Sequence, residues 1–315
     1  MTNKFVFTLL LLFVVAGPLV SCRKENKNNQ ACAEVEFNQQ AVFTYKQPCG
    51  LAISNAGIMV LVEYNGFNAY GSNGITRIWQ NFNDFLANKP PIQTLTSRGA
   101  EAVAFDGNDN LYIAETEATA GIQVYKKIIT NGAVTYQPHR LIQGNTLAGG
   151  FVNPRGLAFD SSNRLYIAND GVGNLIRVDN PMGTATLKII TSSFGSIKGL
   201  AINGTTLYIT LYDSDLVYKC TLRANGDFDT TTAVYRTSKP VDIAVKDGVL
   251  AISSPESGIV TLINTDQMVK GNETYTGCKK EISVGSRVFG LAFTPLDKGL
   301  FAAHLGMNRV IYYKR

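Results

Sequence analysis

The chain has 315 residues, of which 45% are hydrophobic and 17% charged, so it can bury a large core and is neither disordered nor fibrous. Its net charge of +5 is small for this length, and no run of lysine and arginine exceeds two residues. These features argue against a nucleic-acid-binding protein.

The N-terminus has the features of a secretory signal peptide. Lys4 precedes an apolar run from Phe5 to Val20, and Ser21 and Cys22 follow it. The run is short for a transmembrane helix, which needs roughly 17 to 25 apolar residues. We therefore expect residues 1–21 to be a signal peptide and the protein to be exported.

The end of this run, "LVSC" at residues 19–22, resembles the bacterial lipobox. The resemblance implies that Cys22 becomes the first mature residue and carries several acyl chains, which hold a protein firmly where one chain would not. We expect a lipoprotein of the bacterial cell envelope, at the outer membrane, with residues 22–36 as a polar tether. An ordinary cleaved signal peptide is the alternative.

A short apolar unit recurs six times in the rest of the chain. It reads "GLAI", "AVAF", "GLAF", "GLAI", "DIAV" and "GLAF", starting at residues 50, 102, 156, 199, 242 and 290. The copies are therefore 43 to 54 residues apart. A period in this range is typical of propellers and solenoids.

Each copy is followed by further apolar runs that are rich in β-branched and aromatic residues and separated by Gly, Asn, Asp and Ser. Most units contain four such runs, and only "FNDFLANK" suggests a turn of helix. Residues 37–315 are therefore predicted to form an all-β, six-bladed β-propeller with four antiparallel strands in each blade.

The pattern of residues 154–178, "PRGLAFD…LYIAND…NLIRV", resembles the NHL-repeat propellers and, more distantly, the gluconolactonase and regucalcin-like propellers. The resemblance extends from about residue 40 to the C-terminus. It implies a fold and a ligand site at one mouth of the central channel, but no single activity, since one scaffold hosts many functions.

The last unit ends after its third strand, and the segment 41–47 lies where a fourth strand is missing. We expect the N-terminal strand to close the last blade, which removes open sheet edges. Residues 32–46 could also form a hairpin that turns at residues 38–40.

Four cysteines besides Cys22 allow three disulfide connectivities in an exported protein. The hairpin would bring Cys32 near Cys49, which favours that pair. A bond between Cys220 and Cys278 is a second possibility, and four free thiols remain open.

The first strands begin, and the second strands end, at the same mouth of the channel. Candidate ligand-binding residues there are Glu63, Tyr64, Phe67, Tyr70, Glu101, Arg155, Asn169, Lys198, Tyr212, Asp242 and His304. We expect Glu101, Arg155, Lys198 and Asp242 to form a ring of ion pairs that is structural or grips a polar ligand, with Arg155 meeting Asn169.

The lactonase resemblance implies a divalent cation held by acids and amides at the mouth, and Ca²⁺ takes 6 to 8 oxygen ligands. Glu101, Asn169 and Asp242 could provide some of them. Arg155 and Lys198 oppose a cation by about 4 kcal/mol for a close pair. We therefore expect no metal and no cofactor, with calcium as the alternative.

Glu101, Asp242 and His304 are the catalytic candidates if the protein is an enzyme. His304 would act as a general base, with Glu63 beside it. No nucleophile elbow, HExxH motif or P-loop supports catalysis.

Aromatic side chains at the mouth could stack on a sugar or grip a peptide, or they could pack over the blades. Trp79 is expected in the core. The turns between first and second strands are short and look like connections only.

The sequence thus favours a membrane-anchored propeller that binds a small polar ligand, a glycan or a protein partner at the channel mouth. A lactonase-like hydrolase or lyase is the alternative, and a structural part of an envelope complex is a third possibility.

Overall fold

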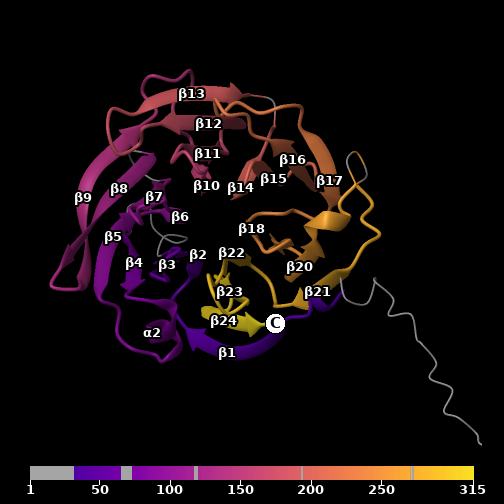
Figure 1. Ribbon diagram of the computed structural model, residues 1–315, viewed down its shortest axis with the longest axis horizontal. Helices are drawn as coiled ribbons and strands as arrows, with labels where there is room; N and C mark the ends of the chain where they lie inside the picture. The colour runs from indigo at the N-terminus through magenta and orange to yellow at the C-terminus, as the bar shows by residue number, and fades with distance from the viewer. Residues whose placement is uncertain (1–31, 65–72, 117–119, 193, 270, 272) are drawn as a thin grey trace, which may run out of the picture.

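The computed structural model describes residues 32–64, 73–116, 120–192, 194–269, 271 and 273–315. The predicted signal peptide, Cys22 and most of the predicted tether lie outside these residues. The described chain forms six four-stranded antiparallel sheets around a central axis, which confirms the six-bladed β-propeller (Figure 1). Among the described residues, no helix has the length and apolar character needed to span a bilayer.

Blades 1 to 3 follow the chain from the inside of the ring to its rim. Blade 1 contains β2 (Pro48–Ile53), β3 (Met59–Glu63), β4 (Asn73–Trp79) and β5 (Gln93–Arg98). Blade 2 contains β6 (Ala100–Phe105), β7 (Leu111–Glu115), β8 (Gly121–Thr130) and β9 (Ala133–Gln143). Blade 3 contains β10 (Pro154–Phe159), β11 (Leu165–Asn169), β12 (Asn174–Asp179) and β13 (Thr186–Thr191).

Blades 4 and 5 repeat this order. Blade 4 contains β14 (Ile197–Asn203), β15 (Thr206–Leu211), β16 (Leu216–Thr221) and β17 (Thr232–Arg236). Blade 5 contains β18 (Ile243–Lys246), β19 (Val249–Ser254), β20 (Ile259–Asn264) and β21 (Lys279–Ser283), with the short helix η1 (Thr265–Gln267) between the last two. The expected helical turn after blade 1's third strand is α2 (Phe82–Leu86).

Blade 6 takes strands from both ends of the chain. It contains β22 (Val288–Phe293), β23 (Gly299–His304), β24 (Arg309–Lys314) and, at the rim, β1 (Asn38–Thr44) (Figure 1). β1 pairs with β24 from Asn38↔Lys314 to Thr44↔Arg309. The N-terminal strand therefore closes the ring as predicted. The alternative hairpin that turns at residues 38–40 is wrong, because these residues lie within the single strand β1.

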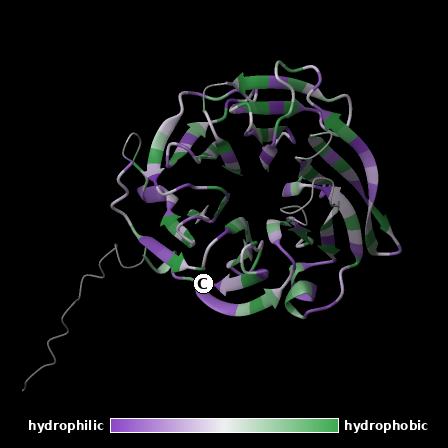
Figure 2. Cartoon of the chain, turned by 180° about the vertical axis from the view of Figure 1, so that it is seen from behind, coloured by the Kyte–Doolittle hydropathy of each residue, from purple (hydrophilic) through white to green (hydrophobic). Residues whose placement is uncertain are grey.

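The recurring unit packs each inner strand between its two neighbouring blades. The leucine of "GLAF" in blade 3, Leu157, lies in a buried cluster with blade 2, whereas the next residue, Ala158, lies in a cluster with blade 4. The two faces of one strand alternate in this way because successive side chains point in opposite directions. In Figure 2, hydrophobic and hydrophilic segments accordingly alternate along the strands around the ring.

The small residues of the unit allow the inner strands to approach closely. A Cβ atom built on Gly156 would lie 2.5 Å from the carbonyl oxygen of Lys198 and 2.7 Å from the amide nitrogen of Leu200, both in blade 4. One on Gly290 would lie 2.5 Å from the carbonyl oxygen of Cys49 in blade 1. Glycine at this position therefore lets the backbones of adjacent blades meet at the channel wall.

The structure contains a disulfide between Cys32 and Cys278, and Cys49 and Cys220 are buried free thiols. The predicted Cys32–Cys49 pair and the Cys220–Cys278 alternative are both wrong. Both cysteines of the predicted pair flank β1, but this strand carries the chain from one face of the ring to the other. Cys32 and Cys49 therefore lie at opposite ends of the blade height.

The ring has two faces, which we name by their features. The mouth face is where the first strands begin and the second strands end. The turn face carries the turns between first and second strands, at residues 54–58, 106–110, 160–164, 203–206, 246–249 and 294–298. In the turn of blade 2, the Asp106 carboxylate accepts hydrogen bonds from the backbone amides of Asn108 and Asn110, at 2.9 Å each. In the turn of blade 3, the Asp160 carboxylate accepts the amides of Ser162 and Arg164 in the same way.

Candidate functional site

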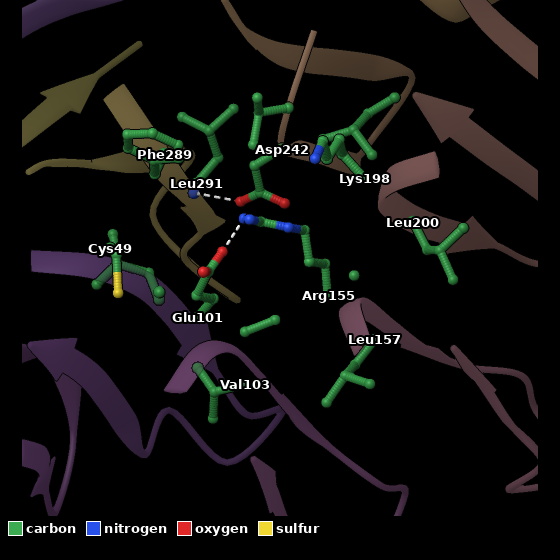
Figure 3. Close-up of a pocket in the computed structure, with 16 residues that line it drawn as sticks. Cys49, Glu101, Val103, Arg155, Leu157, Lys198, Leu200, Asp242, Phe289 and Leu291 are labelled. Carbon is green, nitrogen blue, oxygen red and sulfur yellow. Dashed lines mark hydrogen bonds and ion pairs between the residues drawn. The ribbon is translucent and has the colours of Figure 1, made fainter. Parts of the chain in front are cut away.

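A cavity of about 110 Å³ opens at the mouth face of the channel (Figure 3). All six inner strands, or the residues directly before them, contribute to its wall. The side chains labelled in Figure 3 are Cys49, Glu101, Val103, Arg155, Leu157, Lys198, Leu200, Asp242, Phe289 and Leu291. Four of the predicted mouth residues, namely Glu101, Arg155, Lys198 and Asp242, therefore lie around one cavity.

Arg155 is the central charge of this cavity. Its guanidinium forms an ion pair with Glu101 of blade 2, and its Nε lies 3.2 Å from Oδ2 of Asp170 in its own blade. The side chain of Arg155 is 23% exposed and that of Asp170 only 8%. Two carboxylates therefore hold the guanidinium in place, and part of it remains accessible from the cavity.

Lys198 in blade 4 shares the Asp170 carboxylate. Its ammonium group forms an ion pair with Oδ2 of Asp170, and the hydroxyl of Ser196 donates to Oδ1 at 2.7 Å. Burial lowers the pKa of Lys198, and the nearby charge of Arg155 lowers it further. The ion pairs thus form a chain from Glu101 through Arg155 and Asp170 to Lys198.

Asp242 belongs to a different arrangement from the one predicted. Its Oδ2 accepts the amide of Leu291 in blade 6 at 2.7 Å. Burial raises the pKa of Asp242 to about 7, although hydrogen bonds from the amides of Leu291 and Ile243 oppose the shift. No lysine or arginine in the described part of the chain forms an ion pair with it. The predicted ring of four ion pairs is therefore wrong at this residue.

A ring of apolar side chains lines the channel beneath these charges. It is formed by the second residue of each recurring unit, namely Leu51, Val103, Leu157, Leu200, Ile243 and Leu291. Five of the six also line a wider cavity of about 440 Å³ at the turn face. The charged mouth cavity and the wider cavity at the turn face thus share these apolar residues in their walls.

Tyr212 lies at the rim of the mouth. The ammonium groups of Lys198 and Lys239 lie 5.2 and 5.0 Å from the centre of its ring. Its hydroxyl donates to Glu256, and this hydrogen bond raises the pKa of Tyr212 to about 12. The predicted rim aromatic is therefore present, but it is already engaged by two cations.

Asn169 does not meet Arg155 in the cavity. Its amide group donates to the carbonyl of Gly150 at 2.9 Å and to the side-chain oxygen of Asn174 at 3.0 Å, and its oxygen accepts the amide of Val152 at 2.7 Å. Asn169 is fully buried. It holds the loop before β10, and all of its hydrogen bonds are within blade 3.

His304 and Glu63 are not neighbours. In β23, Leu300 and Ala302 pack with blade 5, so the alternation of side chains turns His304 toward blade 5. In β3, Met59 and Leu61 pack with blade 6, which turns Glu63 toward blade 6. Glu63 pairs with Arg77 at 3.1 Å. The predicted pair is wrong because blade 6 separates the two side chains.

His304 is also unsuited to act as a base on a ligand in the cavity. It is fully buried, and neither ring nitrogen has a hydrogen-bond partner. Burial lowers the pKa of His304 to about 4, and the charge of Arg309 adds to the effect. The side chain is neutral at physiological pH and is not among the residues that line the mouth cavity.

The other predicted aromatics have mixed positions. Tyr64 is half-buried and packs against the cluster that contains Cys49 and Val62. Phe67 and Tyr70 lie outside the described residues. Trp79 is buried, as predicted, and its indole donates to the carbonyl of Lys89 at 2.9 Å.

The residues at the mouth do not fit a lactonase-type cation. Two of the carboxylates, those of Glu101 and Asp170, are bonded to Arg155 and Lys198, and Asn169 is turned away. Within the described ranges, no cluster of three or more His, Cys, Asp and Glu side chains is arranged to hold a metal ion. Cys49 is no alternative nucleophile, since burial raises its pKa to about 12.

Asp170 and Ser196 also take part in this network, although neither was among the predicted ligand-binding residues. Asp170 directly follows β11, and its position near the mouth end of a second strand is evident from the sequence. Ser196 precedes β14 and carries no sequence signal. Asp170 is central because one carboxylate joins the cations of two blades.

Comparisons with known proteins support the fold alone. No family model matches the chain, and no curated protein sequence matches it. A solved structure assigned as a gluconolactonase superposes with a TM-score of 0.59 at 11% identity, over 89% of this chain and 91% of that one. A luciferin-regenerating enzyme gives 0.58 at 11% identity, over 89% and 95%.

Virginiamycin B lyase from Staphylococcus aureus is a third structural neighbour, with a TM-score of 0.55 at 10% identity, over 89% of this chain and 100% of that one. The three neighbours are gluconolactonase-like, regucalcin-like or lyase propellers, in agreement with the predicted architecture. At such low identity they share a fold with this chain, and their activities do not transfer.

Proposed function

We propose that the protein is an exported, lipid-anchored propeller of the bacterial cell envelope that binds a small polar ligand at the mouth of its channel. The observation that carries this proposal is the mouth cavity, where Arg155, Lys198, Glu101 and Asp242 converge from four blades. Binding sites commonly combine an apolar wall with a few convergent polar groups, and the apolar ring supplies that wall.

The size of the cavity limits the ligand. Its volume of about 110 Å³ is below the roughly 300 to 1,000 Å³ of pockets that enclose drug-sized molecules. The cavity therefore suits a small polar molecule, or the polar end of a glycan or protein loop. The cations provide donors for an acceptor group, and Asp242 provides a carboxyl that changes charge near neutral pH.

The lactonase-like alternative has no observation of its own in its favour. The engaged carboxylates leave the mouth without an assembled metal site among the described residues, and the buried His304 does not line the cavity. Asp242 is the one titratable carboxyl of the described cavity wall without a cationic partner. We therefore propose binding without chemistry, at the outer membrane, with Cys22 as the lipidated residue.

The binding proposal is tested by comparing Arg155→Met with the unmodified protein. Small carboxylates, sugars and amino acids would be screened by thermal shift, and the hits titrated by calorimetry. We expect the variant to lose at least about tenfold in affinity, because a hydrogen bond to a charged group contributes roughly 1.5 to 3 kcal/mol.

Arg223→Met is the matched control, since Arg223 forms an exposed ion pair with Asp229 on blade 4. Equal affinities for Arg155→Met and the unmodified protein would show that the ligand binds elsewhere. Lipidation is tested separately by mass spectrometry of the protein from its native membrane, with Cys22→Ser as the control.

A further inference from the structure

The three most exposed large apolar side chains of the described residues all lie on the turn face. Leu296 is 86% exposed in the turn between β22 and β23, Ile129 is 62% exposed at the tip of the β8–β9 hairpin, and Val269 is 61% exposed after η1. A single exposed apolar residue is ordinary. These three lie in blades 6, 2 and 5 and so are spaced around one face of the ring, as contact with a broad surface would require.

The apolar side chains on the mouth face are less exposed than those on the turn face. Among the described residues of that face, the exposed large apolar side chains are Val152, Val172 and Met307, at 41%, 38% and 45%. Val152 lies before β10, Val172 between β11 and β12, and Met307 between β23 and β24. Each of them is less exposed than any of the three on the turn face. The two faces therefore offer matched positions for a comparison.

The N-terminal end of the described chain is attached to the same turn face. Cys32 is bonded to Cys278, which directly precedes β21. The first residue of β21, Lys279, pairs with Ile263 near the turn-face end of β20. The carbonyl of Glu34 also accepts Arg315, the residue after β24, at 3.4 Å. The chain therefore enters the propeller at the turn face.

Cys22 precedes Cys32 by only ten residues. An extended chain spans at most about 3.3–3.6 Å per residue, so these residues reach about 35 Å. A lipid on Cys22 would keep the turn face within that distance of the bilayer. This reach of about 35 Å exceeds the height of a blade, which the seven residues of β1 span in about 20 Å. The tether alone would therefore allow either face of the ring to lie against the bilayer. The exposed apolar side chains favour one orientation.

We infer that the turn face rests on the lipid surface, with Leu296, Ile129 and Val269 in the interfacial region. The channel mouth then faces away from the membrane and is open to ligands from the aqueous side. Lys298, which is exposed two residues after Leu296, suits anionic headgroups. This inference rests on the proposed lipid anchor at Cys22.

The test places a nitroxide label at each position in the full lipidated chain. The variants are Leu296→Cys, Ile129→Cys and Val269→Cys, and the controls on the mouth face are Val172→Cys and Met307→Cys. The native cysteines of the described chain do not compete, because two are bonded and two are buried. The vesicles contain phosphatidylethanolamine and phosphatidylglycerol.

On reconstitution into these vesicles, we expect the three turn-face labels to become several-fold less accessible to a water-soluble nickel chelate and more accessible to oxygen. The two mouth-face labels should not change. Melting temperatures within error of the unlabelled protein would show that each variant folds.

Two outcomes would overturn the orientation while leaving the anchor intact. One is equal accessibility of both faces in protein whose lipid is confirmed by mass spectrometry. The other is shielding of the turn-face labels before vesicles are added, together with a doubled mass, which would mean that a second copy covers the face. Absence of lipid on Cys22 would overturn the anchor, and this inference with it.

Discussion

Asp242 stands where four of the other five inner strands have glycine and blade 2 has Ala102. At the glycines of this position the backbone of the next blade approaches closely, and the Asp242 carboxylate accordingly lies between blades 5 and 6. It does so by accepting the Leu291 amide, and it has no cationic partner in the described chain. Its raised pKa, about 7, is the consequence of this burial.

The pKa of Asp242 predicts a pH-dependent stability. Its folded value of about 7 exceeds the unfolded value of 3.8, so the folded state binds more protons between these two values. Asp242 by itself should therefore lower the free energy of unfolding as pH rises through this window, by up to roughly 4 kcal/mol. Asp242→Asn should remove this contribution, so that the free energy of unfolding of the variant rises between pH 5 and 7.5, as guanidinium unfolding would measure.

His304 has the opposite effect and provides the matched variant. Its folded pKa of about 4 is below the unfolded value of 6.5, so the free energy of unfolding should rise between these two values, by up to roughly 3 kcal/mol. The two slopes largely cancel in the unmodified protein. In His304→Phe, the free energy of unfolding should fall with rising pH, because only the contribution of Asp242 remains. His139→Phe, at the exposed second histidine, should keep the pH profile of the unmodified protein. Flat profiles in both Asp242→Asn and His304→Phe would contradict this account.

At the scale of elements, the inner strand is the unit that positions the site. Its second residue fills the interface with the preceding blade. Its third residue is alanine in every blade and its first is glycine or alanine in all blades but the fifth, which suits the close approach of the following blade. The residue before the unit is then placed at the channel mouth. This is why Glu101, Arg155 and Lys198 come from three successive blades to one cavity.

Gly156→Ala tests this requirement. The added methyl group would meet the backbone of blade 4, which cannot move as a flexible side chain would. We expect a loss of about 1 to 3 kcal/mol in the free energy of unfolding, as for other overpacked cores, measured by chemical denaturation.

The reverse change at the equivalent position of blade 2, Ala102→Gly, is the control for this experiment. It should cost no more than about 1 kcal/mol, the usual backbone effect of glycine. A Gly156→Ala protein as stable as the unmodified one would mean that the inner strands are not in close contact.

At the scale of the whole molecule, closure of the ring depends on residues from both ends of the chain. β1 supplies the rim strand of blade 6, and the Cys32–Cys278 bond joins its approach to blade 5. Glu36 adds an ion pair with Lys280 at 2.5 Å. The seam between the first and last parts of the chain is therefore covalent as well as hydrogen-bonded.

Replacing both cysteines, as Cys32→Ala with Cys278→Ala, should destabilise the fold substantially. The bond closes a loop with a sequence separation of 246 residues, for which loop-closure entropy predicts about 5.5 kcal/mol. Denaturant unfolding with and without reductant would measure the loss. The double variant should be insensitive to reductant. Cys220→Ala, which removes a buried but unbonded thiol and keeps the disulfide, should lose stability on reduction as the unmodified protein does; a similar response to reductant in both variants would contradict the assignment.

The repeat, the four-stranded blades and the closure by the N-terminal strand were all predictable from the sequence alone. Apolar runs, turn residues and their spacing are local properties, and six copies of one pattern admit few architectures. The same reasoning placed Glu101, Arg155 and Lys198 at one mouth, since the topology brings the starts of all inner strands to the same face.

Tertiary structure alone decided which side chains meet. The sequence could not show that Asp170 would join Arg155 to Lys198, that Asp242 would bond to blade 6, or that His304 would face blade 5. It also misassigned the partner of Cys32, which is 246 residues away. Each of these contacts depends on the direction of a side chain and on the packing of blades far apart in sequence, which no local pattern records.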